Sequence, residues 1–127
     1  MRFLSTRVHG AIDYSTGALL IISPWLFGFA DGGAAQWVPV VLGLSILLLS
    51  LLTAYEWGAV KAIPMPLHLG IDLASGALLA VSPWLFGFAA LVWLPHVVIG
   101  LFEVAASLVT QTVLEGDVQG QASGTPA

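Results

Sequence analysis

The eight residues SPWLFGFA occur twice in this chain, at 23–30 and again at 82–89. The identity extends upstream, because the segments 9–30 and 68–89 align without a gap and share 15 of 22 residues. A sequence that recurs within one chain indicates a structural unit that is built more than once. The repeat therefore constrains the architecture before any composition is considered.

The segments that follow the two octapeptides are also similar. WVPVVLGLSILLLSLLT at 37–53 resembles WLPHVVIGLFEVAASLVT at 93–110 once one residue is inserted at His96. Each half of the chain therefore consists of two apolar segments. We predict a single domain over 1–114, with repeat one at 9–55 and repeat two at 67–114, and a disordered tail at 115–127 that is rich in Gly, Gln and Ser.

The apolar segments are long enough to cross a membrane as helices. The chain is 58% hydrophobic and 8% charged, whereas soluble domains carry about 25% charged residues. No Asp, Glu, Lys or Arg occurs between Asp31 and Glu56, or from Leu73 to Phe102. A spanning helix needs about 20 residues and a barrel strand about 10, so we predict an all-α, polytopic four-helix protein with helices at 9–30, 36–55, 67–89 and 93–114.

The few cations predict an orientation. Arg2 and Arg7 precede the first segment, and Lys61 lies between the second and third. An even number of spans places all three on one side, and the positive-inside tendency makes that side cytoplasmic, with both termini. A signal peptide is the alternative for the first segment, but a cleaved leader has no reason to recur at 68–89. We expect a protein of the bacterial inner membrane whose parallel repeats are related by a pseudo-two-fold axis along the membrane normal.

Composition also excludes several classes of function. The chain has no cysteine, so it offers no thiol catalysis, disulfide or iron–sulfur ligation. Its three cations form no basic patch, and we expect no nucleic-acid partner.

Each octapeptide opens on Ser-Pro-Trp, a motif formed by Ser23, Pro24, Trp25, Ser82, Pro83 and Trp84. Proline removes the helical hydrogen bond to the carbonyl four residues earlier, here that of Leu20 or Leu79. We therefore expect a kink at the motif, or a restart of the helix with serine as N-cap. The tryptophan suits a membrane interface and the glycine that follows suits a turn, so we favour a structural corner over a ligand site.

A two-helix unit that carries Ser-Pro-Trp in its first helix, present in two copies, resembles the SPW-repeat family of small bacterial membrane proteins. The resemblance reaches to about Thr112. It implies a four-helix integral membrane protein and does not imply any particular activity.

Ionisable residues within the apolar segments are candidates for function, because such groups are costly and rare in a membrane. His9 and Asp13 share a helical stripe about 60° wide in the first segment, and His68 and Asp72 share the equivalent stripe in the third. If the stripes face each other, the histidine and aspartate groups can form charge-assisted hydrogen bonds.

Three interpretations of these pairs remain open. The pairs fix helix packing near the cytoplasmic interface, they form a proton or ion pathway, or they hold a ligand. The ligand is then a metal bound by two histidines and two aspartates, or a tetrapyrrole with His9 and His68 as axial ligands. The spacing is a weak signal, so we expect no metal or cofactor.

Glu103 has Ile46 as its counterpart in repeat one and lies within an apolar segment. A carboxyl at that depth is either protonated or paired. Glu103 is thus a candidate for proton binding, for a subunit contact, or for a hydrogen bond to a neighbouring helix. We expect His96 near the outer end of the fourth helix, where solvation is cheap.

These observations favour a non-enzymatic membrane protein, a structural or accessory subunit that self-associates or packs on a larger membrane complex. The alternative is a small proton-coupled transporter or channel that uses the intramembrane His, Asp and Glu side chains. The expected partners are the lipid bilayer and further copies of the chain or a larger complex.

Overall fold

Four helices make up the computed structural model, which describes residues 2–114. They are α1 (Thr6–Leu26), α2 (Ala34–Leu51), α3 (Met65–Leu85) and α4 (Leu94–Val109). The described residues form no strand, and only two isolated bridges, Leu4 with Thr110 and Thr53 with Ile63, join extended segments. The prediction of an all-α fold with four helices is confirmed for this part of the chain. The predicted tail at 115–127 lies outside the described residues.

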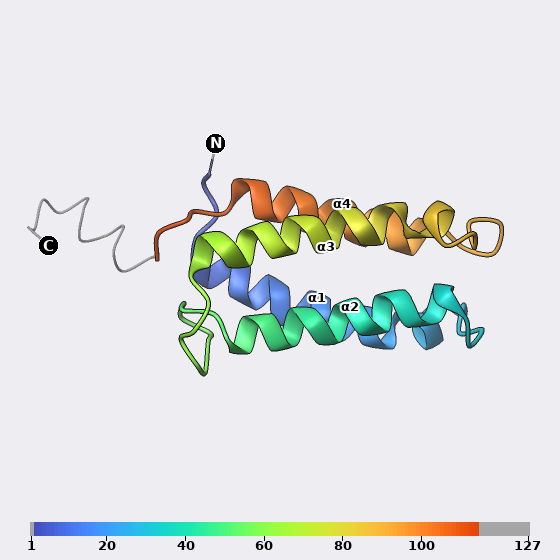
Figure 1. Ribbon diagram of the computed structural model, residues 1–127, viewed down its shortest axis with the longest axis horizontal. Coiled ribbons are helices and arrows are strands. Elements are labelled where there is room, and N and C mark those ends of the chain that lie inside the picture. The colour runs from blue at the N-terminus through green and yellow to red at the C-terminus, as the bar shows by residue number, and fades with distance from the viewer. Residues whose placement is uncertain (1, 115–127) are drawn as a thin grey trace, which may run out of the picture.

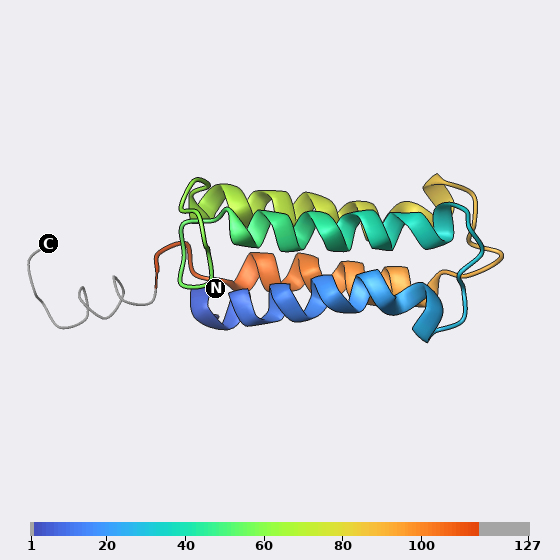
Figure 2. The ribbon, with the colours of Figure 1, turned by 90° about the horizontal axis from the view of Figure 1, so that it is seen from below.

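The helices form two antiparallel hairpins. α1 packs along α2 and α3 packs along α4, and the hairpins lie side by side with α2 next to α3 and α1 next to α4 (Figures 1 and 2). Two short turns, at 27–33 and 86–93, lie together at one end of the bundle. The start of α1 and the 52–64 connection lie at the opposite end. The bundle therefore has a turn end and a terminal end.

Two helices, α2 and α3, are long and apolar enough to cross a membrane. α4 is a shorter apolar helix of 16 residues. Large apolar side chains are exposed on all four helices, including Ile22, Leu44, Leu78 and Leu101. An outer surface of this kind is typical of a protein whose solvent is lipid.

Within each hairpin the two backbones approach closely at a pair of glycines. A Cβ atom on Gly43 would lie 2.7 Å from the carbonyl oxygen of Gly17. A Cβ atom on Gly100 would lie 2.6 Å from the carbonyl oxygen of Gly76. Small residues permit such contacts between helices, and here they occur at repeat-matched positions.

Clusters of buried apolar residues lie along the interior of the bundle. The central one contains Leu20, Ile46 and Leu79. A second cluster at the turn end contains Phe29, Ala35 and Phe88, and a third at the terminal end contains Tyr55, Met65 and Leu69.

The Ser-Pro-Trp motif does not restart the helix. Pro24 and Pro83 lie inside α1 and α3, which continue to Leu26 and Leu85. The serine hydroxyl replaces the missing donor, since Ser23 Oγ donates to the Leu20 carbonyl at 2.9 Å. Ser82 Oγ does the same at the Leu79 carbonyl, at 2.7 Å. The N-cap prediction is therefore wrong, and the serine instead satisfies the carbonyl that proline leaves free.

The helices end one residue after the motif, at Leu26 and Leu85, and a glycine then reverses the chain. Gly28 and Gly87 both adopt φ of 75°. The following amides close the turn, with Phe29 N bonded to the Pro24 carbonyl at 2.8 Å and Phe88 N bonded to that of Pro83 at 2.7 Å. This is a Schellman cap, in which the left-handed residue is usually glycine. It ends α1 and α3 four residues before the ends predicted from hydrophobicity.

We predict that a large side chain at a glycine crossing separates the helices of that hairpin. Gly43→Leu and Gly100→Leu should each lower the free energy of unfolding by at least about 1–3 kcal/mol, the usual range for overpacking. Thermal unfolding in mild detergent, followed by circular dichroism, measures the loss. Gly70→Leu is the matched control, because its Cβ would have no neighbour within 4 Å. Equal losses for all three variants would contradict the proposed crossings.

Candidate functional site

Four ionisable side chains meet inside the bundle, near its terminal end. His9 and Asp13 lie in the first two turns of α1, and His68 and Asp72 lie at equivalent positions of α3. All four side chains are completely buried. We refer to these four residues as the His–Asp cluster.

The cluster is cross-linked by short contacts. His9 Nε2 lies 2.9 Å from Asp72 Oδ2 and 3.1 Å from Asp13 Oδ1. His68 Nε2 lies 2.7 Å from Asp13 Oδ2 and 2.9 Å from Asp72 Oδ2. Each imidazole therefore faces one carboxylate of its own helix and one of the other hairpin. The contacts join α1 to α3 through the centre of the bundle.

A threonine from the opposite repeat holds the second nitrogen of each histidine. His9 Nδ1 lies 2.7 Å from Thr110 Oγ1, and His68 Nδ1 lies 2.6 Å from Thr53 Oγ1. Each threonine hydroxyl donates its single hydrogen to the carbonyl four residues earlier, at 2.6 Å in both cases. The hydroxyl oxygen must therefore accept from Nδ1–H. This network places a proton on Nδ1 of both histidines, and the hydrogen bonds between Nε2 and the carboxylates need a further proton on one of those two groups.

The two carboxylates are only partly satisfied. Asp13 Oδ1 and Asp72 Oδ1 are buried and accept no well-formed hydrogen bond from the described residues, although Asp13 Oδ1 lies 3.1 Å from His9 Nε2. Ser50 Oγ donates weakly to Asp13 Oδ2, at 3.4 Å. Buried acceptors without donors are costly, so the cluster has unused capacity for a positively charged group.

Glu103 extends this polar zone along α4. Its side chain is 1% exposed and packs through Cβ against Gly76. Its carboxyl group lies close enough to Thr16, Asp13 and Asp72 for electrostatic interaction. Neither carboxyl oxygen has a well-formed hydrogen bond to a described residue.

His96 lies far from the cluster, at the turn end. The expectation of easy solvation is wrong, because His96 is only 1% exposed. Its ring lies between those of Phe29 and Phe88, with centroid distances of 5.0 and 4.9 Å. Nε2 donates to the Ala35 carbonyl at 2.9 Å. The inserted residue therefore fills the space between the two turns.

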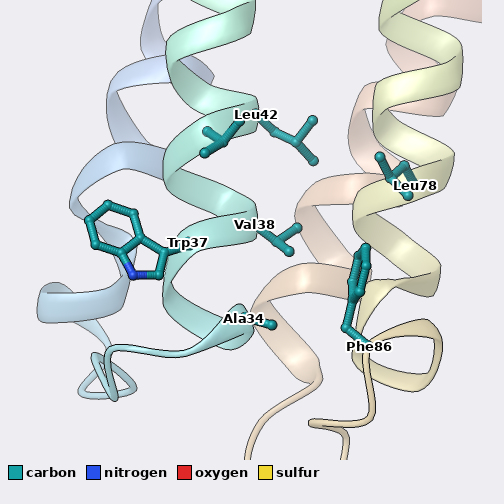
Figure 3. A pocket seen from close by; sticks show the side chains of 7 residues that line it. Ala34, Trp37, Val38, Leu42, Leu78 and Phe86 are labelled. Atoms are coloured by element: carbon teal, nitrogen blue, oxygen red, sulfur yellow. The ribbon is translucent and has the colours of Figure 1, made fainter.

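A separate apolar groove lies between α2 and α3 near the turn end, with a volume of about 340 Å³. Figure 3 shows Val38 projecting from α2 into this space, towards Leu78 and Phe86. The groove is lined by apolar side chains alone: Ala34, Trp37, Val38, Val41, Leu42, Leu78 and Phe86. Such a lining suits a hydrocarbon chain and offers no group for catalysis.

A family model described as SPW repeat domain matches residues 7–110. The chain belongs to the SPW-repeat family. Neither the curated proteins nor the solved structures compared with it give a match. Membership and the apolar helices together indicate a membrane protein. They assign no specific activity.

The sequence of this SPW-repeat protein identifies the four cluster residues but not the threonines that bond to the histidines. His9, Asp13, His68 and Asp72 come together, as facing stripes would require. Thr53 and Thr110 were missed as histidine partners, although they occupy matched positions in the two repeats. The recurrence of threonine at this repeat position was the one signal in the sequence, and it does not identify the partner.

The cluster geometry does not fit a tetrapyrrole between His9 and His68. Asp72 Oδ2 lies 2.9 Å from His9 Nε2, and Asp13 Oδ2 lies 2.7 Å from His68 Nε2. A macrocycle with these nitrogens as axial ligands would need the space that the carboxylates fill. Only a small ligand fits there.

We predict that Asp13→Ala and Asp72→Ala destabilise the bundle by similar amounts. Each change leaves two buried histidines short of a partner, and breaking a buried pair costs about 3–5 kcal/mol. Thermal unfolding in mild detergent measures the effect. Ser15→Ala is the control, because Ser15 is an exposed polar residue of the same helix. An Asp13→Ala variant as stable as this control would show that the cluster does not hold the hairpins together.

Proposed function

We propose that this SPW-repeat protein is a non-enzymatic, structural or accessory protein of the bacterial inner membrane. In this proposal all four helices span the bilayer, the two repeats are related by a pseudo-two-fold axis along its normal, and both termini are cytoplasmic. The protein then associates laterally with further copies of itself or with a larger membrane complex.

The distribution of polarity carries this proposal. The four residues of the His–Asp cluster are buried and contact one another, and Glu103 and His96 are buried as well, whereas large apolar side chains cover the outside. α1 and α3 have 21 residues each, so each is about 31 Å long and matches a hydrocarbon core of about 30 Å. A surface of this kind can contact lipid tails or other apolar helices.

Tryptophans at both ends support the membrane orientation. Trp25, Trp37, Trp84 and Trp93 belong to the turn end, and all are about half exposed or more. Trp57 is half exposed in the connection at the terminal end. Tryptophan is favoured at both membrane interfaces.

The cations support the assignment of sides. Arg2 lies at the terminal end, where its guanidinium donates to the Ser107 and Thr110 carbonyls. Arg7 and Lys61 lie at the same end. The turn end carries no cation among the described residues, so the positive-inside tendency favours a cytoplasmic terminal end.

The orientation can be tested with two matched variants, since the chain has no cysteine. Ala30 and Ala59 are exposed alanines in the turn region and in the 52–64 connection. We predict that a membrane-impermeant maleimide labels Ala30→Cys in intact spheroplasts and labels Ala59→Cys only after permeabilisation. The reverse pattern would invert the orientation, and equal labelling would contradict a spanning arrangement.

Lateral association is tested by native mass spectrometry after release from the original membrane in mild detergent. We expect the mass of a homo-oligomer or of a complex with another polypeptide. A monomer that carries only lipid would contradict the accessory role.

Glu103 favours a second candidate function, a small proton-coupled transporter or channel. Its buried carboxyl lies beside the His–Asp cluster and both of its oxygens lack well-formed hydrogen bonds. Intramembrane carboxyl groups in such positions often carry protons. We expect Glu103→Gln to abolish proton flux into proteoliposomes and Asp31→Asn, at an exposed acid of the turn end, to leave it unchanged. A wild-type protein without flux would contradict this function.

A further inference from the structure

We propose that the His–Asp cluster binds one divalent transition-metal ion of the Zn²⁺ type, through Nε2 of His9 and His68 and one oxygen each of Asp13 and Asp72. This proposal goes beyond the accessory role and rests only on the geometry of the cluster.

The four side chains offer a complete four-coordinate set. Each provides one ligand atom, and these atoms lie within 4.8 Å of one another. Asp72 Oδ2 lies 2.9 Å from Nε2 of both histidines, and Asp13 Oδ2 lies 2.7 Å from His68 Nε2. A tetrahedron with bonds of about 2.0–2.1 Å has edges of about 3.3 Å. A tetrahedral ion would therefore lengthen these edges by a few tenths of an ångström and would draw together the wider pairs of the set, which lie within 4.8 Å of one another.

The threonines prepare both histidines to act as ligands. Because Thr53 and Thr110 accept from Nδ1–H, the lone pair of each neutral imidazole lies on Nε2 and points into the cluster. Histidine ligands of metals generally donate their other N–H to a fixed acceptor in this way. The acceptors here are fixed in turn by their own bonds to backbone carbonyls.

The four side chains of the cluster cannot all be paired by hydrogen bonds among themselves, whereas a central cation could contact all of them. Each Nε2 can supply at most one hydrogen, yet the two nitrogens make four short contacts with carboxylate oxygens. Asp13 Oδ1 and Asp72 Oδ1, both buried, still lack hydrogen bonds. One central ion would bind all four side chains at once. Two carboxylates would also cancel its double charge in an interior where net charge is costly.

The donor set selects the class of metal. Imidazole nitrogen favours Zn²⁺, Co²⁺ and related ions over Ca²⁺ and Mg²⁺, which prefer six or more oxygen ligands. Four protein ligands fill a tetrahedral shell and leave no position for a substrate, which is typical of a structural metal site. The ion would then join α1 of one hairpin to α3 of the other.

Cobalt is a suitable probe, because tetrahedral Co²⁺ absorbs visible light far more strongly than octahedral Co²⁺. The full chain, with a tag that contains no histidine, is produced in cobalt-supplemented medium so that the ion is present as the closed site forms. We expect intense visible bands, one cobalt per chain by elemental analysis, and loss of the bands when zinc is supplied instead. A folded protein without these bands, or with weak octahedral bands only, would overturn the proposal.

Variants of the supporting threonine separate the site from adventitious binding and leave all four ligands intact. Thr53→Val should weaken metal binding by about 10–100-fold, the usual effect of removing such a support. Thr53→Ser keeps the hydroxyl and should restore binding. Asp31→Asn is the acid control and should bind as the wild type does. Equal cobalt binding by Thr53→Val and the wild type, or retention of the bands in Asp13→Asn, would overturn the proposal.

Discussion

The arrangement of the two hairpins depends on the burial of four ionisable side chains against one another. Contacts between hairpins are far less extensive than contacts within them, and the His–Asp cluster joins the diagonally opposed helices α1 and α3 across the interior of the bundle. A histidine or aspartate left alone in an apolar interior is costly. Separation of the hairpins would leave all four side chains without their partners on the other hairpin. The cluster therefore restricts how far the hairpins can slide or rotate relative to each other, which non-directional apolar contacts do poorly.

The interior of each hairpin is held differently. The backbones of the two helices approach closely where Gly17 faces Gly43 and where Gly76 faces Gly100. Among lipid tails, apolar burial provides little drive for association, and close packing of small residues becomes important. The bundle thus combines close packing within hairpins with directional polar contacts between them. Substitutions at the glycines should act on one hairpin, whereas substitutions in the cluster should act on the docking of both.

The sequence predicts the helices and the four cluster residues because the same pattern of residues occurs in both repeats. His9 and His68 recur at the same position before the same motif, and helical periodicity then places the aspartates beside them. The helix ends were predicted less well, since hydrophobicity continues through Phe29 and Phe88 although a glycine at positive φ has already turned the chain. The threonine partners could not be predicted, because their contacts depend on how the hairpins dock. Periodicity within one helix carries no information about that docking.

Two residues of repeat two, His96 and Glu103, have no equivalent in repeat one. His96 is inserted without a counterpart, and its ring fills the space between Phe29 and Phe88, which is a packing role. Glu103 replaces an isoleucine, and neither of its oxygens has a well-formed hydrogen bond. An apolar residue at this position would be cheaper, as Ile46 demonstrates in repeat one by joining the central apolar cluster. A carboxyl group retained there without a firm partner is therefore expected to interact with a species that the rest of the bundle does not provide. Its proximity to Asp13 and Asp72 makes a cation or a proton at the cluster the nearest candidate.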